Sequence, residues 1–265
     1  SNMLFTNIIE VIQDTIEGSD YSLRVHYLDE DADEVKEAVR MCREHKPMGI
    51  LFLGGNIQYF HEEFELVNVP CVLVTDRADK LGFRNLASVS TDDMAAAEMA
   101  VDYLFDHGHR DIAVIGGDMA LSSPSKYRKA GAKRSFIKHG CEFEEESYAV
   151  ARFSYESAYN AMNRMLASKR SITAVFAMSD VMAVGAMRAI FDAGLRVPED
   201  ISVIGFDGTL LADYYNPKIV TVCQGYEKIA RKSIDLLFGM IDLNKPATHE
   251  LVPFSLKNTE SVSSI

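Results

Sequence analysis

Short apolar segments alternate with longer amphipathic segments along almost the whole chain. Several of the apolar segments are hydrophobic at every position, which is typical of strands buried between two layers of helices. Such strands are predicted at 22–28, 49–53, 69–75, 111–116, 172–177, 201–206 and 219–222. The amphipathic pattern predicts helices at 4–18, 33–45, 91–108, 126–140, 154–168, 180–194 and 225–241. Strands that alternate with helices predict an α/β fold with parallel sheets built from right-handed crossovers.

The chain is long for a single sheet of this type, with 265 residues. It also opens on the helical pattern at 4–18, without the strand that should come before it. We therefore expect that the chain lacks, or does not show, the true first strand of the fold.

Composition and charge exclude several classes of partner. The net charge of −12 repels phosphate backbones, so the chain itself is not expected to grip DNA. No apolar run approaches the roughly 20 residues that span a membrane, and the first residues do not resemble a secretory signal. Four widely separated cysteines, at 42, 71, 141 and 223, lack metal-ligand spacing. We therefore expect a cytoplasmic protein with reduced cysteines and with no metal or cofactor.

Polar residues follow nearly every predicted strand. Ligands of open parallel sheets bind beyond the carboxyl ends of the strands, so these residues are candidates for a site. Asp207 follows the strand at 201–206, and Arg128 belongs to the segment after 111–116. An ionised Asp accepts hydrogen bonds from neighbouring hydroxyls and an arginine donates several, which favours a polar ligand with many hydroxyl groups.

Some of these residues have a structural alternative. Asp180 is expected to cap the helix that follows it, and either Asp92 or Asp93 is expected to cap the alanine-rich helix. Arg77 is equally compatible with a solvated charge in a loop. Asp207 is harder to explain as a cap, because no helical pattern clearly begins at Gly208.

Three stretches resemble the effector-binding part of the lactose-repressor family of bacterial transcription regulators. They are residues 90–117, 173–208 and 217–237, and the second contains the specific run GLRVPEDISVIGFD. The resemblance implies two lobes, each a doubly wound parallel sheet, joined by three crossovers as in periplasmic sugar-binding proteins. It implies a first lobe of 1–90 plus 225–247 and a second of 91–224 plus 248–265. The helix-turn-helix headpiece that reads operator DNA in this family is not present in these residues.

The resemblance also implies the positions of the effector contacts. They are Asp76, Arg128, Ser179, Asp207 and Gln224, with Phe153 as a stacking aromatic and Phe5 at the lip of the cleft. The chain has no Trp, so Phe153, Phe206 or Tyr127 would have to supply a face for a sugar. Phe153 is equally compatible with an aromatic packed at the edge of a lobe. Ser179 replaces a common asparagine, and Gly208 replaces a second Asp.

Three functions are compatible with these features. The first is an effector-binding and dimerisation module that binds a sugar or related polyol and controls DNA binding by the headpiece. A homodimer is expected from the resemblance and from the apolar helix at 182–191. The second is a solute-binding protein of a sugar transport system. An enzyme is disfavoured, because no GxGxxG, GxSxG or HExxH motif occurs.

Overall fold

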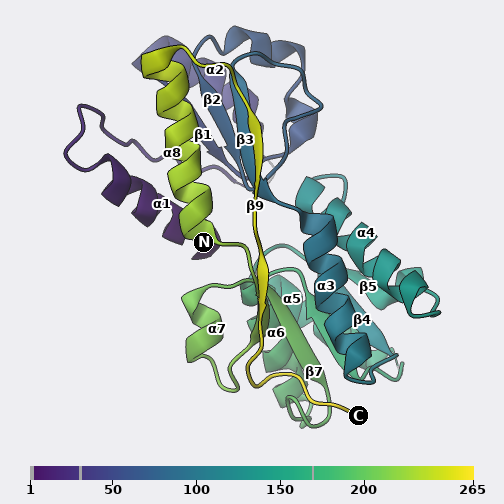
Figure 1. The fold of residues 1–265 in the computed structure, drawn as a ribbon. Helices are drawn as coiled ribbons and strands as arrows, with labels where there is room; N and C mark the ends of the chain where they lie inside the picture. Colours follow the sequence, from purple (N-terminus) through teal and green to yellow (C-terminus); the bar gives the residue numbers. More distant parts are fainter. Residues whose placement is uncertain (1–2, 30–31, 169) are drawn as a thin grey trace.

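The protein has two lobes, placed one above the other in the computed structural model, which describes residues 3–29, 32–168 and 170–265 (Figure 1). The first lobe holds a parallel sheet in the order β1 (Ile50–Leu53), β2 (Cys71–Val74), β3 (Leu86–Thr91) and β9 (His249–Val252). The second sheet has the order β10 (Ser255–Lys257), β8 (Val220–Cys223), β7 (Ser202–Asp207), β6 (Ala174–Ala177), β4 (Ile112–Gly116) and β5 (Tyr148–Val150). Only β10 runs antiparallel to its neighbour in this second sheet, among the described residues. The predicted α/β class is confirmed.

The chain passes between the lobes three times. It crosses after β3, after β8, and again between β9 and β10. The predicted assignment of 248–265 to the second lobe is wrong at its start, because β9 pairs with β3 in the first sheet. The sequence of β9, HELV, has two polar residues before two apolar ones and lies at a sheet edge, so it lacks the continuous apolar run of the inner strands.

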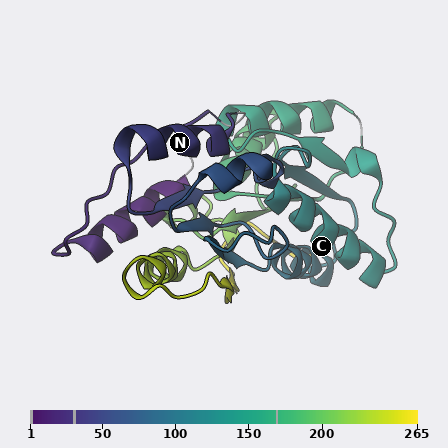
Figure 2. The same cartoon turned by 90° about the horizontal axis from the view of Figure 1, so that it is seen from above.

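Helices cover both faces of the first sheet. On one face, α1 (Met3–Ile16) packs against α8 (Tyr226–Leu243), and their apolar residues meet Val72 and Val74 of β2. On the other face, α2 (Glu34–His45) and the 3-10 helices η1 (Ile57–Tyr59) and η2 (Glu62–Leu66) meet Cys71 and Leu73. Figure 2 shows α8 and α2 on opposite sides of this lobe. Alternate residues of one buried strand therefore serve two separate cores.

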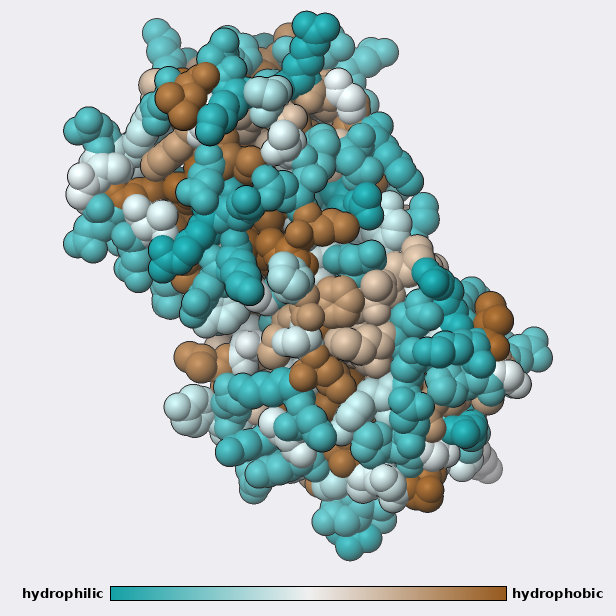
Figure 3. Space-filling view, in the orientation of Figure 1, coloured by the Kyte–Doolittle hydropathy of each residue, from teal (hydrophilic) through white to brown (hydrophobic). Residues whose placement is uncertain are grey.

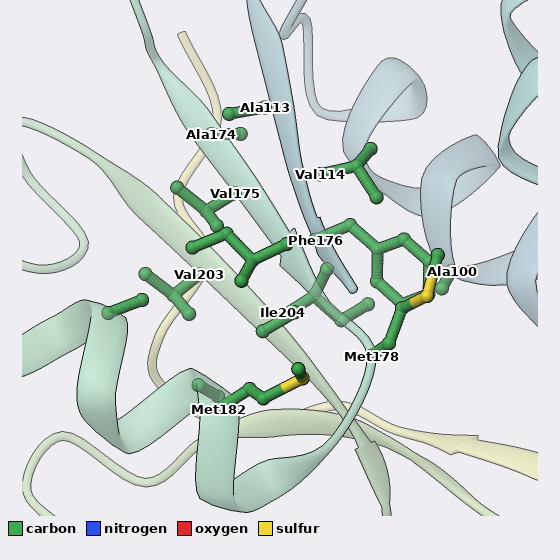
Figure 4. Close-up of a cluster of buried hydrophobic side chains, with 14 of the residues drawn as sticks. Ala100, Ala113, Val114, Ala174, Val175, Phe176, Met178, Met182, Val203 and Ile204 are labelled. Carbon is green, nitrogen blue, oxygen red and sulfur yellow. The ribbon is translucent and has the colours of Figure 1, made fainter. Parts of the chain in front are cut away.

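The second lobe has two closely packed helix pairs. Its helices are α3 (Asp93–Asp106), α4 (Ser123–Lys138), α5 (Tyr155–Ala167) and α6 (Asp180–Asp192), and α3 packs on α4 as α5 packs on α6. Glycines permit this approach: a Cβ at Gly131 would lie 2.1 Å from the carbonyl oxygen of Met94. Residues of β4, β6 and β7 fill the space between the pairs (Figure 4). Phe176 lies at the centre of this cluster.

Two local predictions are wrong. Residues 22–28 form no strand in the described structure, and Tyr27 is 81% exposed. A β-prone sequence becomes a strand only beside a partner, and the residue pattern does not reveal whether a partner is at hand. A short helix, α7 (Leu210–Tyr214), follows β7 although no helical pattern was expected after Gly208. The strands β3, β5, β9 and β10 were also not predicted, because they are short or contain several polar residues.

Candidate effector site

The carboxyl ends of the two sheets face the junction between the lobes. The first sheet continues from β3 directly into α3 of the second lobe, and the second sheet continues from β8 directly into α8 of the first. Because all strands but β10 are parallel to their neighbours, the polar residues at their carboxyl ends gather at this junction. The space-filling view shows that the molecule narrows where the lobes meet (Figure 3).

Arg128 is held rigidly on α4 and is almost completely buried. Its Nε donates to Asp93 Oδ1 at 2.7 Å, and its Nη1 donates to the carbonyl oxygen of Met178 at 2.6 Å. The guanidinium also lies 3.8 Å from the centre of the Phe206 ring, which fixes its plane. Phe206 is therefore covered by Arg128 and fully buried, so it does not offer a face to a sugar.

Asp93 is a buried residue of the junction whose partner the sequence did not reveal. Asp92 caps α3 by accepting from the amide of Ala95, as one of the two alternatives predicted. Asp93, the next residue, instead forms the buried ion pair with Arg128. Only the fold brings α3 and α4 together, so the spacing of Asp93 and Arg128 in the sequence carries no signal for this contact.

Asp207 is the last residue of β7 and is 3% exposed. Its Oδ1 accepts from Gln224 Nε2 at 2.7 Å. Burial raises its pKa well above the usual value, and the neighbouring Asp180 adds to this effect while Arg128 opposes it. Gln224 Oε1 is buried and has no hydrogen-bond partner among the described residues. The structure therefore brings together three of the predicted contacts, Arg128, Asp207 and Gln224.

Asp76 approaches the same region from the first lobe. It follows β2, is 2% exposed, and its Oδ1 accepts from the amide of Arg77 at 2.7 Å. Burial raises its pKa to about 7, with a further increase from Asp93 and a decrease from Arg128. The Ser123 hydroxyl on α4 comes near enough to lower this pKa somewhat, but no hydrogen bond from the described residues reaches Oδ2.

Unusual backbone conformations occur at Asp207 and at the residue directly before Asp76. The described non-glycine residues with positive φ are Lys46, Thr75, Asp207 and Asn244. Lys46 and Asn244 end helices, where the left-handed conformation is common. Thr75 has φ of 70° directly before Asp76, and Asp207 has φ of 119°. A branched residue in this region costs roughly 1–3 kcal/mol, and such strain concentrates at functional sites.

Ser179 takes the capping role that was expected of Asp180. Ser179 caps α6 by accepting from the amide of Met182 at 3.1 Å, so the prediction that Asp180 is the cap is wrong. Asp180 is fully buried and accepts from the amide and hydroxyl of Thr209 and from the hydroxyl of Thr221. These bonds tie the start of α6 to the loop after β7 and to β8. Asp180 thus supports Asp207 rather than facing a ligand.

An aromatic ring covers a glycine at the edge of each sheet. A Cβ at Gly54, after β1, would lie 2.8 Å from the ring of Phe5. A Cβ at Gly117, after β4, would lie 2.9 Å from the ring of Phe153. Both rings are partly exposed and lie beside the strand ends. Phe153 also packs against the core of the second lobe.

Buried polar atoms without partners occur mainly at the carboxyl ends of strands. Among the described residues they are Asn7 Nδ2, Asp76 Oδ2, Ser90 Oγ and Gln224 Oε1. Asp76 and Gln224 directly follow strands that end at the junction, and Ser90 is the penultimate residue of β3. A buried polar group that lacks a partner costs about 1–3 kcal/mol, so a polar ligand that met these atoms would be bound favourably.

Direct contacts between the lobes accompany these groups. Gln58 of η1 donates through Nε2 to the carbonyl oxygen of Ala120 at 2.9 Å, and the Tyr155 hydroxyl lies 3.8 Å from Met3 Sδ.

The described residues contain no group of three or more His, Cys, Asp or Glu arranged to hold a metal ion. None of the described helices is long and apolar enough to cross a membrane. The cysteines are free thiols.

Comparison with known proteins assigns the class. Residues 101–262 match the family described as "Periplasmic binding protein-like domain". The chain is 32% identical over its full length to the HTH-type transcriptional regulator MalR of Clostridium butyricum and covers 79% of that protein. It is 29% identical over 90% of its length to the repressor PurR of Pasteurella multocida, covering 71% of it.

Solved structures share the whole fold. A protein from Actinobacillus succinogenes superimposes with a TM-score of 0.89 at 26% identity, over 99% of this chain and 95% of that one. The regulator CelR in complex with cellobiose has a TM-score of 0.85 at 24% identity, over 97% and 79% of the two chains.

The fold and the polar site between its lobes define a ligand-binding domain of the periplasmic-binding-protein type. The chain belongs to the lactose-repressor family of bacterial transcriptional regulators, of which it represents the effector-binding domain. Members of this family are regulators and not enzymes, as the sequence predicted.

Proposed function

We propose that the chain binds a sugar or related polyol between its lobes and thereby controls DNA binding by a headpiece outside these residues. The observation that carries this proposal is the pair of buried, unpartnered acceptors, Asp76 Oδ2 and Gln224 Oε1, contributed from opposite sides of the junction. Hydroxyl groups donate to such acceptors, and Arg128 is fixed at the same junction by its ion pair with Asp93. The proposed polar contacts with the effector are Asp76, Arg128, Asp207 and Gln224. Phe5 and Phe153 would contact the effector at the edges of the site. Ser179, which caps α6, would lie next to it.

Two structural neighbours with bound ligands support a sugar as the effector of this chain. One neighbour is described with bound cellobiose, and a regulator from Enterococcus faecium with bound ribose has a TM-score of 0.85 at 21% identity. The names of the curated relatives favour a cytoplasmic regulator over a solute-binding protein of a transport system.

The regulatory step requires that the effector distinguish two lobe arrangements. The hydrogen bond from Gln58 to Ala120 joins the two lobes in the arrangement described above. An effector bound between the lobes would favour the same arrangement. In a dimer, a shift in lobe arrangement would alter the spacing of two headpieces.

A homodimer is part of this proposal, but the structure does not support the apolar helix at 182–191 as its interface. The apolar residues at 182–191 lie mostly inside the second lobe, because α6 packs on α5 and on the sheet. Exposed apolar side chains lie instead on the extended segment after α1, at Leu23, Val25, Tyr27 and Leu28. Light scattering at micromolar concentration tests the dimer, and a monomer mass would contradict it.

A thermal-shift screen of neutral sugars, polyols, nucleosides and purines tests the function. A ligand at 100 times its dissociation constant adds about 2.7 kcal/mol of stability. A sugar that stabilises the wild type but not Asp207→Asn supports the proposal. Binding of a nucleoside or purine with full affinity in Asp207→Asn would contradict it.

A further inference from the structure

Charge at the junction is unbalanced. Among the described residues, one guanidinium is buried there, that of Arg128, which is 4% exposed. Four carboxylates are buried in the same region: Asp76, Asp93, Asp180 and Asp207. The other buried cation, Lys129, turns to Glu145 and to the ring of Tyr148.

Two of the four carboxylates are compensated inside the protein. Asp93 is paired with Arg128, and Asp180 accepts three hydrogen bonds from Thr209 and Thr221. Asp76 is not compensated in this way, since no described residue donates a hydrogen bond to its Oδ2. Asp207 accepts from an amide, which carries no charge.

The cations near these acids already have carboxylate partners. Arg128 donates through Nε to Asp93 and through Nη1 to the carbonyl oxygen of Met178, so its charge is already balanced by the buried Asp93. Arg77, which acts on the pKa of Asp93, is partly exposed and forms two bonds with Asp79 at 3.0 and 3.2 Å. Asp92 lies near it as a further negative charge.

We propose that this site selects its effector by charge, accepting an uncharged or amino-bearing polyol and excluding the uronic acid or phosphate ester of the same sugar. The inference rests on the proposed function, because it concerns the ligand of the same site. An anionic group between Asp76 and Asp207 would face two carboxylates in a buried region, where like charges repel strongly. A hydroxyl or ammonium group would instead donate to Asp76 Oδ2 and Gln224 Oε1.

Proton linkage supports the same selection. Burial raises the pKa of Asp76 to about 7, with Asp93 raising it and Ser123 and Arg128 lowering it. The pKa of Asp207 is also raised, by burial and by Asp180 and Asp93, against Arg128 and Gln224. An anion would bind only with proton uptake by these acids, so any residual affinity for it would grow as the pH falls. An ammonium-bearing ligand would show the opposite dependence.

Matched sugar sets test the proposal by calorimetric titration at pH 8. Suitable sets are glucose, glucosamine, glucuronate and glucose 6-phosphate, the galactose equivalents, and ribose with ribose 5-phosphate. In any set that binds, the neutral or amino member is expected to bind at least about tenfold more tightly than the anion. An anion that binds equally or more tightly would overturn the proposal.

Asp76→Asn is the informative variant, with Asp235→Asn on the exposed face of α8 as a control that removes the same charge. In Asp76→Asn the anion is expected to lose less affinity relative to the neutral sugar, whereas the control keeps the wild-type ratio. An unchanged ratio in Asp76→Asn would contradict the role of this carboxylate.

A ligand-free measurement keeps the charge argument separate from the proposed function. Without ligand at pH 8, Asp76→Asn is expected to melt at a higher temperature than the wild type, because an uncompensated buried charge is removed. At pH 5 the difference between the two melting temperatures should be smaller than at pH 8. A lower melting temperature at pH 8 would show that the protein itself compensates Asp76, and would overturn the proposal. A further outcome separates the two proposals. If no sugar binds but Asp76→Asn still melts at the higher temperature at pH 8, the proposed sugar binding is wrong, whereas the excess of buried negative charge is confirmed.

Discussion

The two lobes contribute to the site in different ways. In the second lobe, Arg128, Asp93, Asp207 and Gln224 hold one another through hydrogen bonds and an ion pair. In the first lobe, Asp76 Oδ1 accepts from the amide of its own neighbour, Arg77, while Oδ2 has no donor among the described residues. The second lobe is thus a preorganised platform, while the first lobe presents a polar group that is still unsatisfied. Binding energy for holding the lobes together should therefore come mainly from the first-lobe contact.

Removing Arg128 is expected to produce the largest effect. Arg128→Ala leaves Asp93 buried without its partner, and breaking such a pair costs roughly 3–5 kcal/mol. The sequence alone does not reveal this ion pair, because only the fold brings α3 and α4 together. Urea unfolding at pH 7.5 measures the loss.

The control is Arg134→Ala on the same helix, where the arginine is exposed and pairs with Glu98 at 3.2 Å. Its loss should change the free energy of unfolding by about 0.5 kcal/mol or less. Equal, small losses in both variants would mean that the second lobe is not a preorganised platform.

Asp207→Asn comes next and separates ligand binding from folding. The amide can still interact with Gln224, and the apolar residues of β7 provide the packing. We expect the affinity for a sugar effector to fall by about 1.5–3 kcal/mol, the scale of a hydrogen bond to a charged group. The ligand-free melting temperature should not fall, because the burial of a charge is relieved. Calorimetric titration and thermal melts of the variant measure the two effects, and a lowered melting temperature with unchanged affinity would contradict the role of Asp207.

Stability should respond to pH through the first-lobe acid. The pKa of Asp76 is raised in the folded state to about 7, from an unfolded value near 3.9. The folded protein therefore binds the proton more tightly, so stability is lowest above pH 7 and rises as the pH falls toward 4. Between these values the gain is about 1.4 kcal/mol per pH unit for this group. The buried His109, whose pKa is lowered, acts in the opposite direction below about pH 6. The difference in stability between wild type and Asp76→Asn, measured from pH 8 to 5, isolates Asp76; a flat difference would contradict this assignment.

The same contrast shows how far a sequence can predict a site. Apolar runs such as ISVIGF and ITAVFA are buried on both faces, so they predicted the inner strands and the polar residues at their ends. The pairing of Asp93 with Arg128 depends on which helices meet, which no local pattern encodes. The buried bonds of Asp180 to Thr209 and Thr221 likewise depend on segments that are distant in the sequence. The segment 22–28 failed for a related reason, since a strand is defined by its neighbour and not by its own residues.

The smallest expected effect concerns the strained residue that positions Asp76. Thr75 adopts a φ of 70°, a conformation that glycine reaches without steric cost. Thr75→Gly is expected to change the free energy of unfolding by only about 0.5–1 kcal/mol, in the stabilising direction, because relief of strain exceeds the added freedom of the unfolded chain. Lys46→Gly, at the left-handed end of α2, is the matched control for backbone relief away from the site. Both variants should gain stability. Only Thr75→Gly should weaken effector binding, because the flexible glycine would no longer hold the Asp76 side chain in one orientation. Equal affinity in the two variants would show that the strain at Thr75 does not serve the site, and would make the first lobe's contribution independent of its backbone.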